Sequence, residues 1–154
     1  MNSSSPIVGI ISGSASDKDI VDKITGILDS FSLSWEYNVF SAHRTPKKCA
    51  SYVSSAEERG IKVLIGVAGL AAALPGVMAA HTILPVIGVP GSGGPLNGED
   101  ALHSIVQMPP GIPVATVGIG NGKNAGYLAA HIIALTSPET REKLIEYRKS
   151  LGDD

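Results

Sequence analysis

A histidine beside an arginine is the pair of side chains in this sequence with the clearest chemical potential. His43 and Arg44 lie in the segment Ser-Ala-His-Arg-Thr-Pro, residues 41–46. An imidazole carries protons near neutral pH because its ordinary pKa is about 6.5, and a guanidinium binds phosphate through a planar set of donors. The pair predicts a proton carrier beside an anion-binding group. The alternative is a solvated His and Arg at the start of a helix.

A small polar segment near the N-terminus is a second candidate. Residues 12–17 read Ser-Gly-Ser-Ala-Ser-Asp and come before an expected helix. Small side chains with free backbone N–H groups at a helix start favour a phosphate. The segment matches neither G-x-G-x-x-G nor a Walker A sequence, so a dinucleotide or triphosphate is not indicated. Ser16 with Asp19 is also a plausible capping box, and the two roles are compatible because different residues serve each.

The other residues that could do chemistry favour ordinary structural roles. His81, His103 and His131 are expected at packed or surface positions, and no His, Cys, Asp or Glu cluster has metal-ligand spacing, so no metal is expected. The single cysteine, Cys49, is expected to be a small buried helix residue. Because it cannot form an internal disulfide, a reducing cytosol is the expected location.

Length and charge exclude several classes of protein. A chain of 154 residues predicts one domain over residues 1–154, and its net charge of −2 without a run of more than two Lys or Arg disfavours nucleic acid and anionic membrane as partners. Residues 1–6 show no signal-peptide pattern. Residues 63–97 lack Asp, Glu, Lys and Arg, but Gly and Pro divide them into short core elements rather than a membrane span. Only 17% of residues are charged, whereas a disordered chain has low hydrophobicity and high net charge, so disorder is excluded. The excess of apolar over charged residues favours an oligomer, because subunit interfaces bury additional surface.

Strand and helix patterns alternate five times along the chain. Because apolar runs without alternation indicate strands buried on both faces, the pattern predicts one α/β domain with a parallel sheet and helices on both faces. Ligands bind beyond the carboxyl ends of the strands in such sheets. The expected strands are 7–11, 35–40, 62–67, 85–89 and 114–119, and the expected helices are about 17–31, 45–59, 71–80, 99–106, 123–135 and 140–151.

Two loops offer backbone rather than side-chain chemistry. Residues 68–76, Ala-Gly-Leu-Ala-Ala-Ala-Leu-Pro-Gly, could let a flat ligand approach the main chain, or could simply allow tight helix packing. Residues 104–113 form a stiff, Pro-rich segment that is expected to wall a pocket. The last helix, over 140–151, is left over once the sheet is covered and is expected to pack on a neighbouring subunit.

Five motifs taken together resemble the PurE family, which comprises N5-carboxyaminoimidazole ribonucleotide mutases and aminoimidazole ribonucleotide carboxylases of purine biosynthesis. The resemblance runs in order from about residue 7 to 150. The two most specific segments are 41–46, Ser-Ala-His-Arg-Thr-Pro, and 104–109, Ser-Ile-Val-Gln-Met-Pro. The others are Gly-Ser-x-Ser-Asp at 13–17, Leu-Pro-Gly at 74–76 and Leu-x-Gly-x-Asp-Ala-Leu at 96–102.

The resemblance implies a flavodoxin-like three-layer αβα sandwich, assembled as a cytoplasmic homo-octamer with sites at subunit interfaces. It implies a ribonucleotide monophosphate as substrate, CO2 as a reactant, and no cofactor or metal. The family's catalytic histidine falls on His43, and its phosphate- and ribose-binding residues fall on Ser14, Asp17 and Arg44. The further expected substrate-binding residues are Ser16, Ser41, Gly69, Leu70 and Ala71.

The implied reaction is the mutase reaction, in which the substrate's carbamate leaves as CO2 and is recaptured at a ring carbon. Direct carboxylation with CO2 is the alternative. Two departures from many bacterial mutases stand out, Ala73 in place of a His and Lys18 in place of a Trp. A non-enzymatic receiver or flavodoxin-like module is the remote alternative. A receiver is disfavoured because it needs acidic residues at the end of its first strand to bind Mg²⁺, and this chain has none there. A flavin-binding module is disfavoured because aromatic residues, which usually flank the flavin ring, make up only 5% of the chain.

Overall fold

A parallel sheet of five strands forms the centre of the molecule. The computed structural model describes residues 5–152 of the chain. The strands are β1 (Val8–Ser12), β2 (Trp35–Val39), β3 (Val63–Ala68), β4 (Val86–Pro90) and β5 (Ala115–Thr116), all parallel to their neighbours in the order β2-β1-β3-β4-β5. This is the strand order of flavodoxin-like sheets, which confirms the predicted α/β class.

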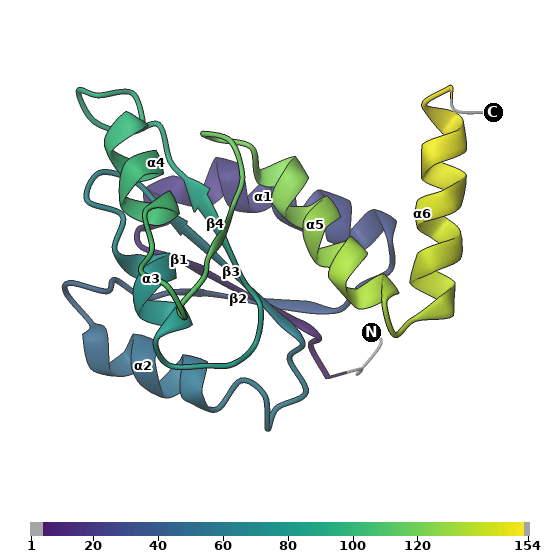
Figure 1. The fold of residues 1–154 in the computed structure, drawn as a ribbon, viewed down its shortest axis with the longest axis horizontal. Coiled ribbons are helices and arrows are strands. Elements are labelled where there is room, and N and C mark those ends of the chain that lie inside the picture. The colour runs from purple at the N-terminus through teal and green to yellow at the C-terminus, as the bar shows by residue number, and fades with distance from the viewer. Residues whose placement is uncertain (1–4, 153–154) are drawn as a thin grey trace.

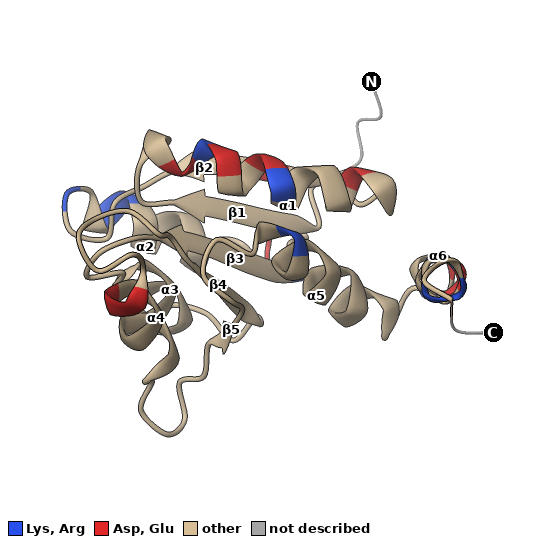
Figure 2. Cartoon of the chain, turned by 90° about the horizontal axis from the view of Figure 1, so that it is seen from above, with Lys and Arg blue, Asp and Glu red and all other residues tan. Residues whose placement is uncertain are grey.

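Helices cover both faces of the sheet and complete the predicted three layers (Figure 1). α1 (Lys18–Ser30) and α5 (Gly122–Ala134) pack side by side on one face. α2 (Pro46–Ser54), α3 (Leu74–Ala79) and α4 (Glu99–Val106) lie on the other. Figure 2 shows charged residues along the outward side of α1 and around the last helix, whereas the central strands β1, β3 and β4 carry none.

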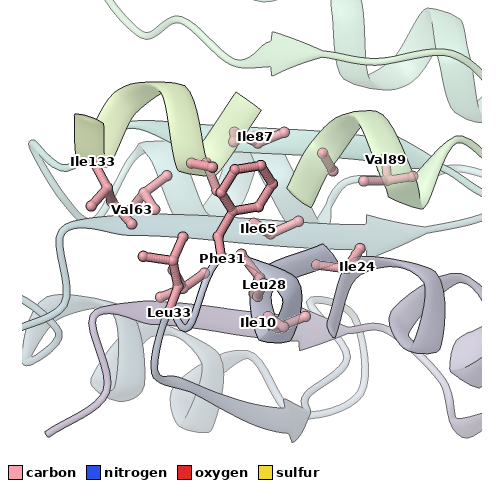
Figure 3. Close-up of a cluster of buried hydrophobic side chains, with 14 of the residues drawn as sticks. Ile10, Ile24, Leu28, Phe31, Leu33, Val63, Ile65, Ile87, Val89 and Ile133 are labelled. Atoms are coloured by element: carbon pink, nitrogen blue, oxygen red, sulfur yellow. The ribbon is translucent and has the colours of Figure 1, made fainter. Parts of the chain in front are cut away.

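The core is divided by the sheet into two apolar clusters. Figure 3 shows the cluster on the α1 and α5 side, where Ile10 and Ile65 from the strands meet Ile24 and Leu28 from α1. The cluster on the other side joins α2, α3 and α4 to the sheet and includes fully buried Cys49, as predicted for a small helix residue. The uncharged stretch 63–97 is accordingly split into β3, α3 and β4. None of the described helices is long and apolar enough to span a bilayer.

Glycines in the central strands bring α3 close to the sheet. A Cβ on Gly66 would lie 2.8 Å from the Met78 sulfur and 3.2 Å from Cγ of Pro75. A Cβ on Gly88, which pairs with Gly66 in the sheet, would lie 3.3 Å from Cβ of Pro75 and 2.4 Å from Cγ2 of Ile105. The Pro75 ring therefore occupies space that side chains at these two strand positions would fill.

A pair of glycine substitutions is expected to change stability in opposite directions. A Cβ on Gly126 of α5 would lie 2.7 Å from Cβ of Ile27 on α1, so Gly126→Ala should lower the free energy of unfolding by about 1–3 kcal/mol through overpacking. A Cβ on Gly26, inside α1, would meet nothing within 4 Å. Gly26→Ala should therefore raise stability by about 0.4–1 kcal/mol. Urea unfolding of both variants checks this, and equal effects of the two would contradict the tight α1–α5 packing.

Three predicted elements are longer than the observed ones. α2 ends at Ser54 rather than near residue 59, because the Ser55 hydroxyl donates to the Tyr52 carbonyl and the chain continues as turns to Gly60, whose φ is +93°. α3 begins at Leu74 rather than about residue 71, because the preceding residues form a turn. β5 has two residues rather than six, since it is an edge strand that pairs only with β4.

The last helix, α6 (Pro138–Ser150), stands beside α5 at one end of the molecule (Figure 1). Tyr147 of α6 stacks on Tyr127 of α5 with ring centroids 4.7 Å apart, and Phe31 meets both rings edge-on. Lys143 Nζ donates to the Phe31 carbonyl. α6 thus packs on its own chain. That it also packs on a neighbouring subunit stays a prediction.

Candidate functional site

A pocket of about 550 Å³ lies beyond the carboxyl ends of the strands, at the β1/β3 boundary. The chain runs from β1 outward to β2 and then returns to β3 on the other side of β1, so this boundary is the switch point at which ligands bind in such sheets. Four loops line the pocket, over residues 13–17, 41–44, 68–74 and 93–94. All nine predicted site residues are among the lining residues: Ser14, Ser16, Asp17, Ser41, His43, Arg44, Gly69, Leu70 and Ala71.

The loop after β1 is shaped by hydrogen bonds among its own residues. Ser14 is the N-cap of a 3₁₀ turn over Ala15–Asp17, and its Oγ accepts from the Ser16 N–H at 3.2 Å and from the Ser16 hydroxyl at 3.0 Å. Asp17 Oδ2 accepts from the Ser14 N–H at 3.1 Å. The predicted capping box of Ser16 with Asp19 is therefore wrong. The box is made by Ser14 and Asp17, because the 3₁₀ turn starts the helical segment ahead of α1.

Ser14 and Asp17 consequently both shape this loop and line the pocket. The Asp17 side chain is partly buried. Burial raises the pKa of the Asp17 carboxyl above its ordinary value, and the hydrogen bond from the Ser14 N–H opposes that rise.

The loop after β2 presents His43 and Arg44 at its tip. Thr45 Oγ1 donates to the Ser41 carbonyl at 3.1 Å and accepts from the Ser41 N–H at 2.9 Å, while Ser41 Oγ accepts from the Arg44 N–H at 3.1 Å. Thr45 is the N-cap residue of α2 and Pro46 follows it, but the Thr45 hydroxyl closes this turn and makes no capping hydrogen bond to α2. The closed turn leaves the His43 and Arg44 side chains exposed.

A hydrogen bond joins the two loops across the pocket. Arg44 Nη2 donates to the Gly13 carbonyl at 3.4 Å, a long and weak bond. The guanidinium carries five N–H donors, so this contact positions Arg44 beside the Ser14 loop while leaving donors for a phosphate. Exposed His43 lines the same pocket.

The loops after β3 and β4 form the rest of the pocket from small residues. The Gly91 N–H donates to the Ala68 carbonyl at 2.8 Å, and a Cβ on Gly91 would lie 3.4 Å from the Gly69 Cα, so the two main chains touch. Leu70, at a left-handed φ of +54°, lies against Gly94, where a Cβ would be 2.3 Å from Leu70 Cδ2. Ser104 of α4 donates to the Ala71 carbonyl at 3.2 Å.

Sequence reasoning missed Gly93 and Gly94, which line the pocket. The sequence signal that could have found them is their position just after the expected strand at 85–89, since ligands bind beyond the carboxyl ends of such strands. The Pro-rich segment 104–113 was expected to line a pocket, but none of its residues lines this one in the single chain. Residues 111–113 instead line a cavity at the opposite edge of the sheet, beside Ile83 and Pro85.

The remaining candidate residues lie away from the pocket. His81, His103 and His131 are exposed, as expected for surface positions, and none of them lines it. Within residues 5–152, no group of three or more His, Cys, Asp or Glu side chains could hold a metal ion. Ala73, by contrast, lines the pocket.

The strand order and the place of the pocket define a flavodoxin-like α/β domain with a pocket at its switch point. Similarity to known families narrows this class further. A family model described as AIR carboxylase matches residues 7–154, and the chain belongs to that family.

Known proteins resemble the chain along most of its length. A relative from Pyrococcus abyssi named N5-carboxyaminoimidazole ribonucleotide mutase is 54% identical, over 95% of this chain and 84% of that protein. A Schizosaccharomyces pombe protein named phosphoribosylaminoimidazole carboxylase is also 54% identical, over 87% of this chain but only 24% of its own longer one. A crystal structure described as Treponema denticola PurE has a TM-score of 0.87 at 31% identity, covering 96% of this chain and 92% of that one.

Proposed function

We propose that the chain is an N5-carboxyaminoimidazole ribonucleotide mutase of purine biosynthesis. One observation carries the proposal: His43, Arg44 and the Ser14 loop surround a single pocket, with Arg44 hydrogen-bonded to Gly13 across it. A proton carrier thus lies beside groups suited to a phosphomonoester. Names of relatives in the same family, among them the mutase of Pyrococcus abyssi, support this assignment.

The phosphate of the substrate is held, in this proposal, by Arg44 and the Ser14 loop. The donors to the phosphate are the guanidinium N–H groups of Arg44 and the hydroxyl of Ser14. Ser16, Asp17 and Ser41 complete the polar side of the site and hold the ribose. Binding energy from the sugar phosphate fixes the aminoimidazole ring relative to His43, which lowers the entropic part of the barrier.

His43 is the proton carrier of the proposed reaction. When the N–C bond of the carbamate breaks, CO2 leaves and the nitrogen takes a proton from the protonated imidazole. The neighbouring ring carbon then attacks CO2, and this carbon briefly carries both a hydrogen and the new carboxylate. Neutral His43 removes that proton, which restores the aromatic ring and returns the histidine to its starting state.

CO2 has to stay in the pocket between the two steps. Gly69, Leu70 and Ala71 line one side of the pocket, and they present backbone and apolar side chains rather than charged groups. Such a wall disfavours water that would hydrate the CO2. Ala73 belongs to the same segment and adds only a methyl group.

Direct carboxylation of aminoimidazole ribonucleotide is the second candidate, favoured by the carboxylase name of the Schizosaccharomyces pombe relative. Supplying each substrate with and without bicarbonate separates the two. The mutase should convert the carbamate substrate at a rate that added bicarbonate does not change. Absolute dependence on added bicarbonate would contradict the mutase and establish the carboxylase.

We also infer a homo-octamer in the cytoplasm with sites completed by neighbouring subunits. Large apolar side chains on the surface support an assembly: Ile83 is 89% exposed and Leu135 is 84% exposed. Apolar side chains that are exposed on a single chain become covered where they lie in a subunit contact.

A further inference from the structure

A buried hydroxyl lies directly beneath the loop that we assign to the phosphate. Ser12 is the last residue of β1 and has no exposed surface. Its Oγ donates to the Ser14 carbonyl at 2.8 Å and lies 2.7 Å from the Tyr37 Oη. A buried hydroxyl needs such partners, and both of these are well within hydrogen-bond range.

The direction of the second bond follows from counting protons. A serine hydroxyl has one proton to donate, and Ser12 donates it to the Ser14 carbonyl. Tyr37 must therefore donate its phenolic proton to Ser12 Oγ. The result is a chain of two hydrogen bonds that runs from Tyr37 through Ser12 to the backbone of Ser14.

Both ends of this chain are anchored. Tyr37 lies in β2, in register with Ile10 of β1, and packs against the buried cluster on the α1 side of the sheet. The Ser12 carbonyl accepts from the Phe40 N–H at 3.0 Å, and the Gly13 N–H donates to the Val67 carbonyl at 3.0 Å. The Ser14 carbonyl is thereby tied through side chains to a strand whose position the sheet fixes.

These bonds leave one donor of Ser14 free for a ligand. The Ser14 N–H donates to Asp17, the Ser14 carbonyl accepts from Ser12 and from the Asp17 N–H at 3.3 Å, and Ser14 Oγ accepts from the N–H and the hydroxyl of Ser16. Among the hydrogen bonds of residues 5–152, the hydroxyl proton of Ser14 has no acceptor. Because the other polar groups of Ser14 are hydrogen-bonded within the protein, its hydroxyl can donate to a phosphate oxygen.

We propose that Ser12 and Tyr37 are positioning residues for phosphate binding, which act by fixing the Ser14 loop. The inference rests on the proposed function, because it takes the ligand of this loop to be the substrate's phosphate. Neither side chain lines the pocket, so neither would touch the substrate. Their effect is expected on affinity and not on the proton transfer at His43.

The test uses Ser12→Ala, Tyr37→Phe and the double variant, with KM and kcat measured for the carbamate substrate. Each single variant should raise KM about five- to tenfold, the effect of one lost hydrogen bond, and leave kcat within about twofold. Because Tyr37 acts through Ser12, adding Tyr37→Phe to Ser12→Ala should raise KM no further. Tyr52→Phe is the matched control: it removes the bond from Tyr52 Oη to Glu36 Oε1, away from the pocket, and should leave KM unchanged.

A purely structural role would give a different pattern. In that case the single variants would lower the unfolding temperature as Tyr52→Phe does, with KM unchanged, and the inference would be overturned. Additive KM effects in the double variant would overturn the relay through Ser12. Tyr37→Phe alone decides the question if Ser12→Ala does not fold.

Binding of inorganic phosphate separates this inference from the proposed function. Stabilisation of the protein by phosphate, followed as a thermal shift, should need about five- to tenfold more phosphate in Ser12→Ala than in the unsubstituted protein. If the unsubstituted protein does not convert the carbamate substrate but this phosphate shift is found, the proposed mutase fails while the positioning role stands. Turnover with unchanged KM and phosphate affinity in Ser12→Ala would instead support the mutase and overturn the positioning role.

Discussion

Replacing His43 with asparagine is expected to lower kcat by about a hundred- to ten-thousandfold, the range for loss of a positioned acid–base group. Asparagine keeps a polar side chain of similar size at this exposed loop tip, but its amide neither gains nor loses a proton near neutral pH. In the proposed site the substrate's phosphate contacts other residues, so affinity should change little. Turnover measured at saturating substrate and binding measured by calorimetry check the two halves of the prediction separately.

The control for this variant is His103→Asn. His103 is an exposed histidine of α4 that does not line the pocket, and its replacement should leave kcat unchanged. If His43→Asn retained a tenth or more of the activity, the proton carrier would have to be another group. The fold should not be affected by either change, which far-UV circular dichroism can verify.

Replacing Arg44 with alanine is expected to raise KM about thirty- to several hundredfold, as for a lost charge-assisted contact to phosphate. Two effects are expected to combine, because the variant would lose the donors that we propose for the phosphate and also the bond from Arg44 Nη2 to the Gly13 carbonyl. Arg44→Lys restores the charge without the planar fork, so it should recover only part of the affinity. Steady-state kinetics over a range of salt concentrations measure the loss.

Lys47→Ala is the charge-matched comparison for Arg44→Ala. Lys47 is an exposed cation in the first turn of α2 and is not among the lining residues of the pocket. Its removal should change KM by less than about threefold, since a screened surface charge acts weakly at a distance. An Arg44→Ala variant that bound substrate as tightly as Lys47→Ala would contradict the phosphate role of Arg44.

The central elements of the fold could be predicted from the sequence because burial leaves a clear pattern. β1, β3 and β4 are continuous apolar runs, and the structure places each within one residue of its expected ends. Elements stabilised by fewer contacts were predicted less well. β5 pairs on one side only, and the end of α2 depends on the Ser55 hydroxyl, which competes for a backbone carbonyl.

The candidate site was predictable where side chains carry a chemical signal and a strand fixes their place. His43 and Arg44 follow one strand and Ser14 another, and parallel strands bring their carboxyl ends to one edge. Gly93 and Gly94 have no side-chain chemistry, and their place at the pocket depends on Gly91 touching Gly69. The roles of Ser14 and Asp17 in the capping box required knowledge of the 3₁₀ turn, which sequence patterns rarely reveal.

The fit of Pro75 against Gly66 and Gly88 has a consequence for how this enzyme could evolve. α3 begins at Leu74, where the segment that lines the pocket ends. The distance of that segment from the sheet therefore depends on the absence of side chains at the two glycine positions. A methyl group at Gly66 would press on Met78 and Pro75, and one at Gly88 would press on Ile105 and Pro75, so either is expected to shift α3 and the segment attached to it. Substrate fit is thereby coupled to positions inside the sheet that no ligand ever reaches.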